Sequence, residues 1–119
     1  MSWRIEEFRT AAGETPVRAF ISGLHGDAKA EAVALIKLAE ALGSKLREPH
    51  SKALGGGLFE LRRNQVRLFY VFEPGYVIRL LDGMVKKQDR IPADVLARVR
   101  GYQKVALERL KDAKTRKKR

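Results

Sequence analysis

The spacing of hydrophobic residues at the start of the chain predicts a strand and then a short helix. Residues Ser2–Phe8 alternate weakly between polar and apolar side chains, as expected of a strand with one buried face. Thr15-Pro16 then places an N-cap residue before a proline, which is a favoured start for a helix. We expect this helix to run through Ile21 and to end near Gly23.

A second, longer helix is predicted from apolar residues at helical spacing. Asp27 is its candidate N-cap, and Gly43 is its candidate end. The next segment, Ser44–Gly57, has no hydrophobic period and ends in three glycines, so we interpret it as a connection. The apolar residues of the helix recur at i, i+3, i+4 and i+7: Leu35, Leu38, Ala39 and Leu42.

Three runs rich in β-branched and aromatic residues follow this connection. Short pairs of turn residues, Asn64-Gln65 and Pro74-Gly75, separate the runs, which therefore predict a three-stranded antiparallel meander. Met84-Val85 extends the last run and could add a fourth strand. The three runs are Leu58–Arg63, Val66–Glu73 and Tyr76–Leu81.

A final helix is predicted from Pro92, with one apolar stripe that is wide enough to dock on a sheet. The order of elements has no strand–helix–strand alternation, which favours a small α+β fold with antiparallel strands. A chain of 119 residues fits one domain, which we place at residues 1–110, followed by a basic, disordered tail at residues 111–119. The stripe consists of Val95, Val99, Tyr102, Ala106 and Leu110.

Charge is the unusual feature of the composition. The chain has 25 Lys and Arg against 14 Asp and Glu, a net charge of +11, which favours nucleic acid as a partner and an anionic membrane surface second. Six of the basic residues lie in residues 111–119, which we interpret as solvated. Arg100, Lys104 and Lys111 lie beside the apolar stripe of the last helix and are interpreted as its solvated face.

Composition also excludes several kinds of chemistry. The chain has no cysteine and two histidines, which excludes disulfides, iron–sulfur clusters, thiolate catalysis and cysteine zinc sites. Nothing in the sequence calls for a metal or another cofactor. There is no apolar run suited to secretion or to a membrane helix, so we expect a cytoplasmic protein.

Two arginines of the predicted meander fall directly opposite each other. With Asn64-Gln65 as a tight turn, Arg62 and Arg67 each lie two positions from it on adjacent strands. Like charges placed in this way destabilise a sheet by about 0.2–1 kcal/mol, and a phosphate between them would relieve the repulsion. The alternative interpretation is that both arginines face solvent, with Glu60 and Glu73 as their partners.

No common catalytic motif is present. Gly55–Gly57 precedes a strand rather than a helix, so it is not a phosphate-binding loop of the usual kind. His50 is a lone histidine in a loop, and such residues are often structural. If the protein is an enzyme, Lys and Arg would stabilise negative charge while His50 or Tyr70 moves a proton. Cleavage of RNA by its own 2′-hydroxyl fits this description, because the substrate supplies the nucleophile.

Four blocks of sequence stand out: Pro49–Leu54, Gly57–Arg62, Val66–Tyr70 and Leu80–Lys87. Together these blocks resemble the phage-derived HigB-like toxins of the RelE/ParE superfamily. The similarity extends from about Thr15 to Leu110. It implies a RelE-like fold, in which a curved antiparallel sheet of three to five strands packs against N-terminal helices and a C-terminal helix around a basic concave site.

The resemblance also implies a type II toxin that cleaves messenger RNA, typically on the ribosome. RelE ends this region with a catalytic tyrosine, whereas residues 88–92 contain none, so either Arg90 or His50 substitutes in proton transfer or cleavage is slow. We expect catalytic roles for Arg62, Arg67, Lys86, Lys87 and His50, and RNA contacts for Lys52, Tyr70 and Arg90.

Three functions therefore compete. The first is a metal-independent mRNA endoribonuclease that inhibits translation. The second is a ParE-like poison of DNA gyrase, although that subgroup generally lacks the basic set of residues. The third is a nonenzymatic basic protein that binds RNA or the ribosome. The expected partners are messenger RNA on the ribosome and a cognate antitoxin, commonly a helix-turn-helix protein. We expect no association with a membrane.

Overall fold

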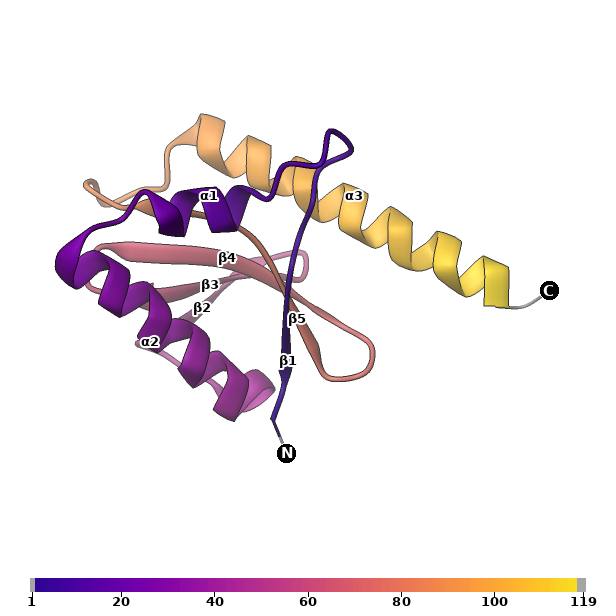
Figure 1. Ribbon diagram of the computed structural model, residues 1–119, viewed down its shortest axis with the longest axis horizontal. Helices are drawn as coiled ribbons and strands as arrows, with labels where there is room; N and C mark the ends of the chain where they lie inside the picture. Colours follow the sequence, from indigo (N-terminus) through magenta and orange to yellow (C-terminus); the bar gives the residue numbers. More distant parts are fainter. Residues whose placement is uncertain (1, 118–119) are drawn as a thin grey trace.

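A mixed five-stranded sheet organises the chain, and the computed structural model describes it over residues 2–117 (Figure 1). The strands lie in the order β1-β5-β4-β3-β2. Strands β2 to β5 form an antiparallel meander that includes the three predicted strands. In chain order the elements are β1 (Arg4–Glu7), α1 (Pro16–Ser22), α2 (Gly26–Leu42), the 3₁₀ turn η1 (Gly43–Lys45), β2 (Ser51–Gly55), β3 (Leu58–Arg63), β4 (Val66–Glu73), β5 (Val77–Val85) and α3 (Ala93–Lys117).

Helices cover both faces of the sheet. On one face, α1 and α2 pack on the strands through a core that includes Val17, Leu35 and Leu68. On the other face, α3 contributes Val99 and Ala106 to a second core. Burial of each large apolar side chain contributes about 1.5–3 kcal/mol, so these two layers hold the central strands in place.

The two N-terminal helices lie close to their predicted positions. Helix α1 occupies the segment between Thr15 and Gly23, as predicted. Helix α2 has His25 rather than Asp27 at its N-cap, and Asp27 lies in the first helical turn instead. A carboxylate in that turn still favours the helix, because it lies near the positive end of the helix dipole.

Strand β2 corrects the interpretation of residues 44–57 as a connection. It is an edge strand in which only Ser51 is buried, so it has no hydrophobic alternation that could reveal it in the sequence. The strand forms through backbone pairing with β3, in a register that places Ser51 opposite Leu61 and Lys52 opposite Glu60. This pairing brings the residues just before β2 next to the end of β3.

Two features of the other edge also differ from the prediction. Strand β1 runs parallel to β5, so the sheet is mixed rather than wholly antiparallel. A parallel neighbour needs a long connection, and the two helices and the first meander strands supply one. Met84 and Val85 continue β5 instead of forming a further strand. Gly83 in β5 leaves room for Phe20 of α1, whose ring a Cβ at this position would overlap.

Helix α3 starts as predicted after Pro92 but ends later than expected. It continues through Lys117, so residues 111–117 are helical and the expected domain boundary at residue 110 falls within the helix. The lysines, alanine and arginine of this segment are good helix formers, which accounts for the extension. In Figure 1 these last turns of α3 extend beyond the sheet. Lys118 and Arg119 lie outside the described residues.

One residue on the predicted solvated face of α3 has a structural role. Arg100 donates hydrogen bonds from Nη1 to the backbone oxygen of Gly55 at 2.8 Å and from Nη2 to that of Leu54 at 2.9 Å. These bonds attach α3 to the end of β2, and they correct the interpretation of Arg100 as a solvated cation. Lys104 and Lys111 are exposed, as expected.

Candidate functional site

A pocket lies at the end of the meander, where the β3–β4 turn meets the residues that precede β2. Its volume is about 490 Å³. Three of the residues predicted to be catalytic, His50, Arg62 and Arg67, line it together. The full lining is Pro49, His50, Arg62, Arg63, Asn64 and Arg67.

Arg62 on β3 and Arg67 on β4 lie directly opposite each other, as predicted. Arg67 is buried at 7% exposure, whereas the side chain of Arg62 is 28% exposed. Nη1 of Arg67 donates to the backbone oxygens of Asn64 at 2.7 Å and Val66 at 3.0 Å. The β3–β4 turn therefore orients Arg67, which is buried and does not face solvent as the alternative interpretation expected, whereas Arg62 is partly exposed. Glu60 is a charge partner of both arginines, as that interpretation expected, but Glu73 pairs with Arg79 instead.

A buried carboxylate lies beside both arginines. Glu60 is 2% exposed, and its Oε1 lies 3.4 Å from Nε of Arg62 and 3.9 Å from Nε of Arg67. Neither contact is a hydrogen bond, because both Nε atoms and Oε2 of Glu60 are buried without a hydrogen-bond partner. The carboxylate thus compensates charge in this cluster without using the donors of the arginines.

The electrostatic environment of Arg67 reflects this arrangement. Its pKa lies below the ordinary value for arginine, mainly because burial removes the guanidinium from water. The negative charge of Glu60 raises the pKa, and the positive charge of Arg62 lowers it. An anion entering the pocket would act in the same direction as Glu60 and favour the charged form of Arg67.

The predicted lysines and Arg90 lie outside the pocket lining. The backbone N–H of Lys86 donates to the oxygen of Gln65 at 2.7 Å, which places Lys86 beside the β3–β4 turn, with Lys87 next in the chain. Lys52 is exposed on edge strand β2, and Arg90 is exposed in the loop between β5 and α3. Among the predicted lysines and Arg90, it is therefore Lys86 that a backbone hydrogen bond places at the turn bordering the pocket.

Tyr70 lies on the opposite face of the sheet, in the core beneath α1 and α2. It is 1% exposed, and its hydroxyl shares a hydrogen bond of 2.8 Å with that of Ser51. Burial raises the pKa of Tyr70, and the hydrogen bond with Ser51 lowers it by a smaller amount. An RNA base cannot stack on a ring packed in this way, which corrects the predicted RNA contact.

Sequence reasoning missed part of the pocket. Pro49, Arg63 and Asn64 were not among the predicted site residues, although all three line it. Alternation along β3 carried the relevant signal for the cluster, because Glu60 and Arg62 are two residues apart and so share a face. Burial of Glu60 depends on neighbouring strands and is not visible in this local pattern.

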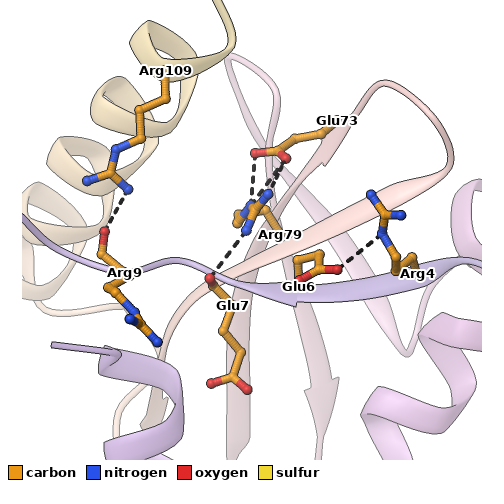
Figure 2. Close-up of polar contacts among 7 residues, drawn as sticks. All are labelled: Arg4, Glu6, Glu7, Arg9, Glu73, Arg79 and Arg109. Carbon is orange, nitrogen blue, oxygen red and sulfur yellow. Dashed lines mark hydrogen bonds and ion pairs between the residues drawn. The ribbon is translucent and has the colours of Figure 1, made fainter. Parts of the chain in front are cut away.

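A second buried glutamate lies at the other end of β4, in the region that Figure 2 shows. Glu73 accepts three hydrogen bonds from Arg79, at 2.8, 3.1 and 3.2 Å. Arg79 also donates to the backbone oxygen of Glu7 at 3.3 Å, and Arg109 of α3 donates to that of Arg9 at 2.6 Å. These contacts join β1, β4 and β5 and attach α3, so we interpret this cluster as structural.

Two further findings concern residues 2–117. In this range, no three His, Asp or Glu side chains are grouped so that they could hold a metal ion. None of the helices described there is both long and apolar enough to cross a membrane.

Comparison with protein-family models matches residues 19–104 to the phage derived protein Gp49-like family (DUF891). The match includes the whole meander and every residue that lines the pocket. The chain belongs to the Gp49-like family. A search of curated proteins found no match. Membership in the Gp49-like family confirms the phage-derived part of the resemblance inferred from the sequence.

Proposed function

We propose that this Gp49-like protein is the HigB-like toxin of a type II toxin–antitoxin system and cleaves messenger RNA on the ribosome. The observation that carries the proposal is the pair of opposed arginines, Arg62 and Arg67, beside one pocket. Guanidinium groups are well suited to phosphate, because they present several fixed donors and a permanent positive charge. The family assignment is compatible with a toxin of this kind.

The pocket suits cleavage that uses the 2′-hydroxyl of the RNA as nucleophile. The 2′-oxygen would form a bond to the adjacent phosphorus while the bond from phosphorus to the 5′-oxygen breaks. The products are a 2′,3′-cyclic phosphate and a 5′-hydroxyl. Negative charge grows on the phosphate oxygens in the transition state, where Arg62 and Arg67 would stabilise it.

His50 is the candidate for proton transfer, because it lines the same pocket as the arginines. It would accept the proton of the 2′-hydroxyl or donate one to the leaving 5′-oxygen. Lys86 and Lys87 would contact neighbouring phosphates of the RNA chain. These contacts position the substrate but do not require the lysines to line the pocket.

Expression in bacteria without an antitoxin tests the proposal. The wild-type protein should arrest growth and create new transcript ends, whereas Arg67→Ala should do neither at equal levels of folded protein. Loss of one such donor costs about 10²–10³ in rate in comparable sites. Arg4→Ala, which removes an exposed arginine of β1, is the matched control and should remain toxic. Equal toxicity of Arg67→Ala and wild type would contradict the mechanism.

Mapping of RNA and DNA ends in the same cells separates the competing functions. DNA damage without new transcript ends would indicate a gyrase poison. Ribosome binding with intact RNA would indicate a nonenzymatic protein. We also propose an antitoxin, of the helix-turn-helix class, that binds this protein and restores growth. Failure of a protein encoded beside it to co-purify or to restore growth would remove this part of the proposal.

A further inference from the structure

Hydrogen bonding among the buried polar atoms beside the pocket is incomplete. In the part of the chain that the structure describes, three buried side-chain atoms lack a hydrogen-bond partner, and all belong to Glu60, Arg62 and Arg67. Buried polar groups are almost always paired, so a cluster of unpaired ones at one place calls for an explanation. All three lie in the cluster that borders the pocket.

The positions of the three side chains explain why these atoms have no hydrogen-bond partner. Oε1 of Glu60 lies between the two Nε atoms, at 3.4 and 3.9 Å, and so bonds fully with neither. Because both Nε atoms are buried and Nη1 of Arg67 donates to the backbone of Asn64 and Val66, a ligand in the pocket would meet Nη2 of Arg67 and the terminal nitrogens of Arg62. Glu60 therefore lies behind the arginines. There its negative charge offsets part of their positive charge, while the nitrogens that would bind the ligand stay free of Glu60.

Charge counting shows what ligand this cluster fits. Arg62, Arg67 and Glu60 together carry a net charge of +1, and two of them, Glu60 and Arg67, are buried. The exposed Arg63 of the pocket lining and the exposed Glu48, which lies 3.8 Å from Nη1 of Arg62, add charges that cancel each other. An internal phosphodiester carries one negative charge and would neutralise the cluster. A terminal phosphate carries nearly two at pH 8, because its second pKa is about 6, and would leave an excess negative charge. Such an imbalance is costly beside Glu60 and Arg67, because both charges are buried.

We propose that Glu60 is a specificity-determining positioning residue that tunes the pocket to a phosphodiester and against a terminal phosphate. The inference rests on the proposed function, in which Arg62 and Arg67 bind the scissile phosphate. It gives the site a means to hold an uncut linkage inside an RNA chain in preference to the phosphorylated end of a fragment.

Calorimetric titration at pH 8 tests the proposal with two ligands that differ by one methyl group. The first is 2′-O-methyladenosine 3′-phosphate, a dianion, and the second is its methyl ester, a monoanionic diester that the blocked 2′-oxygen protects from cleavage. The wild-type protein should bind the diester more tightly. Glu60→Gln should bind both ligands more tightly, with about tenfold gain or more for the dianion.

The ratio of the two gains is the decisive measurement. Because Coulomb energy is proportional to charge, the logarithm of the gain should be about twice as large for the dianion as for the diester. Glu73→Gln is the matched control: it also neutralises a buried glutamate beside arginine, but far from the pocket lining, and should leave both affinities unchanged. Glu60→Asp retains the charge and should retain the preference of the wild-type protein.

Different results would contradict different parts of the argument. If the wild-type protein binds neither ligand, the proposed phosphate site itself is wrong. If it binds the dianion more tightly than the diester, the role of Glu60 is wrong, whether or not Glu60→Gln folds. Equal gains for both ligands in a folded Glu60→Gln protein would also overturn this role, since they would show a general effect on charge and not a choice between ligands.

Discussion

Two buried glutamates in this protein pair with arginine in different ways. Glu73 accepts three hydrogen bonds of 2.8–3.2 Å from Arg79, and the two charges cancel. Glu60 lies beside two arginines at 3.4 and 3.9 Å, makes no hydrogen bond with either, and leaves a net charge of +1. The two clusters share residue types and low exposure of the carboxylate, but they differ in whether the donors of the arginine are occupied.

This difference distinguishes an ion pair that holds the fold from a cluster that is available to a ligand. Arg79 uses its Nε and both terminal nitrogens on Glu73 and on the backbone of Glu7. Arg67 uses Nη1 on the turn and leaves its charge partly uncompensated. Stability should therefore depend most on the Glu73 cluster, and anion binding should depend on the Glu60 cluster.

The largest expected effect on stability comes from Arg79→Ala. The change leaves the carboxylate of Glu73 buried without its partner, which should lower the free energy of unfolding by about 3 kcal/mol. Urea denaturation followed by circular dichroism measures this loss. Binding of RNA by the folded fraction should be unchanged, since Arg79 does not line the pocket. A loss below about 1 kcal/mol would show that this ion pair contributes no more than an exposed one.

Arg62→Ala should show the opposite behaviour. It removes the repulsion between opposed arginines and leaves Glu60 beside Arg67, so we expect the free energy of unfolding to stay within about 1 kcal/mol of wild type. Inorganic phosphate at ten times its dissociation constant should stabilise the wild-type protein by about 1.4 kcal/mol through mass action. The same phosphate concentration should not stabilise Arg62→Ala.

Arg4→Ala is the control for this measurement, because it removes an arginine whose side chain is 71% exposed and paired with Glu6. It should lose little stability and keep the full response to phosphate. Phosphate stabilisation that persists in Arg62→Ala but disappears in Arg4→Ala would place the anion site on β1 and contradict the comparison of the two clusters.

The sequence could reveal one part of this comparison and not the other. The two-residue turn at Asn64-Gln65 and the alternation of strand side chains are enough to place Arg62 opposite Arg67. The hydrogen bonds of Glu73 and their absence at Glu60 depend on small differences in the distances between side-chain atoms, which are 2.8–3.2 Å in one cluster and 3.4–3.9 Å in the other. A local pattern contains no information on such distances, so the partner of each glutamate could not be assigned.

Elements with weak hydrophobic patterns were the least predictable parts of the fold. Strand β2 has one buried residue, Ser51, and is defined by its pairing with β3. Its position matters for function, because it brings His50 beside Arg62, whose backbone N–H donates to the oxygen of His50 at 2.8 Å. The helical state of residues 111–117 follows from helix propensity, which a count of charges does not reveal.

The smallest expected effect comes from Ser51 and Tyr70, a neutral pair on the opposite face of the sheet. Their side chains are buried and hydrogen-bonded to each other, so the pair shows how much one such hydrogen bond contributes to stability. Tyr70→Phe removes the hydrogen bond and should lower the free energy of unfolding by about 1 kcal/mol at neutral pH.

Since burial raises the pKa of Tyr70, the wild-type protein should lose stability as pH rises above about 10, where the tyrosine of the unfolded chain releases its proton first. Denaturation curves between pH 7 and 11 should therefore converge for the two proteins. Curves that remain parallel would show that Tyr70 ionises equally in both states, and RNA cleavage should be unaffected because the hydroxyl faces away from the pocket.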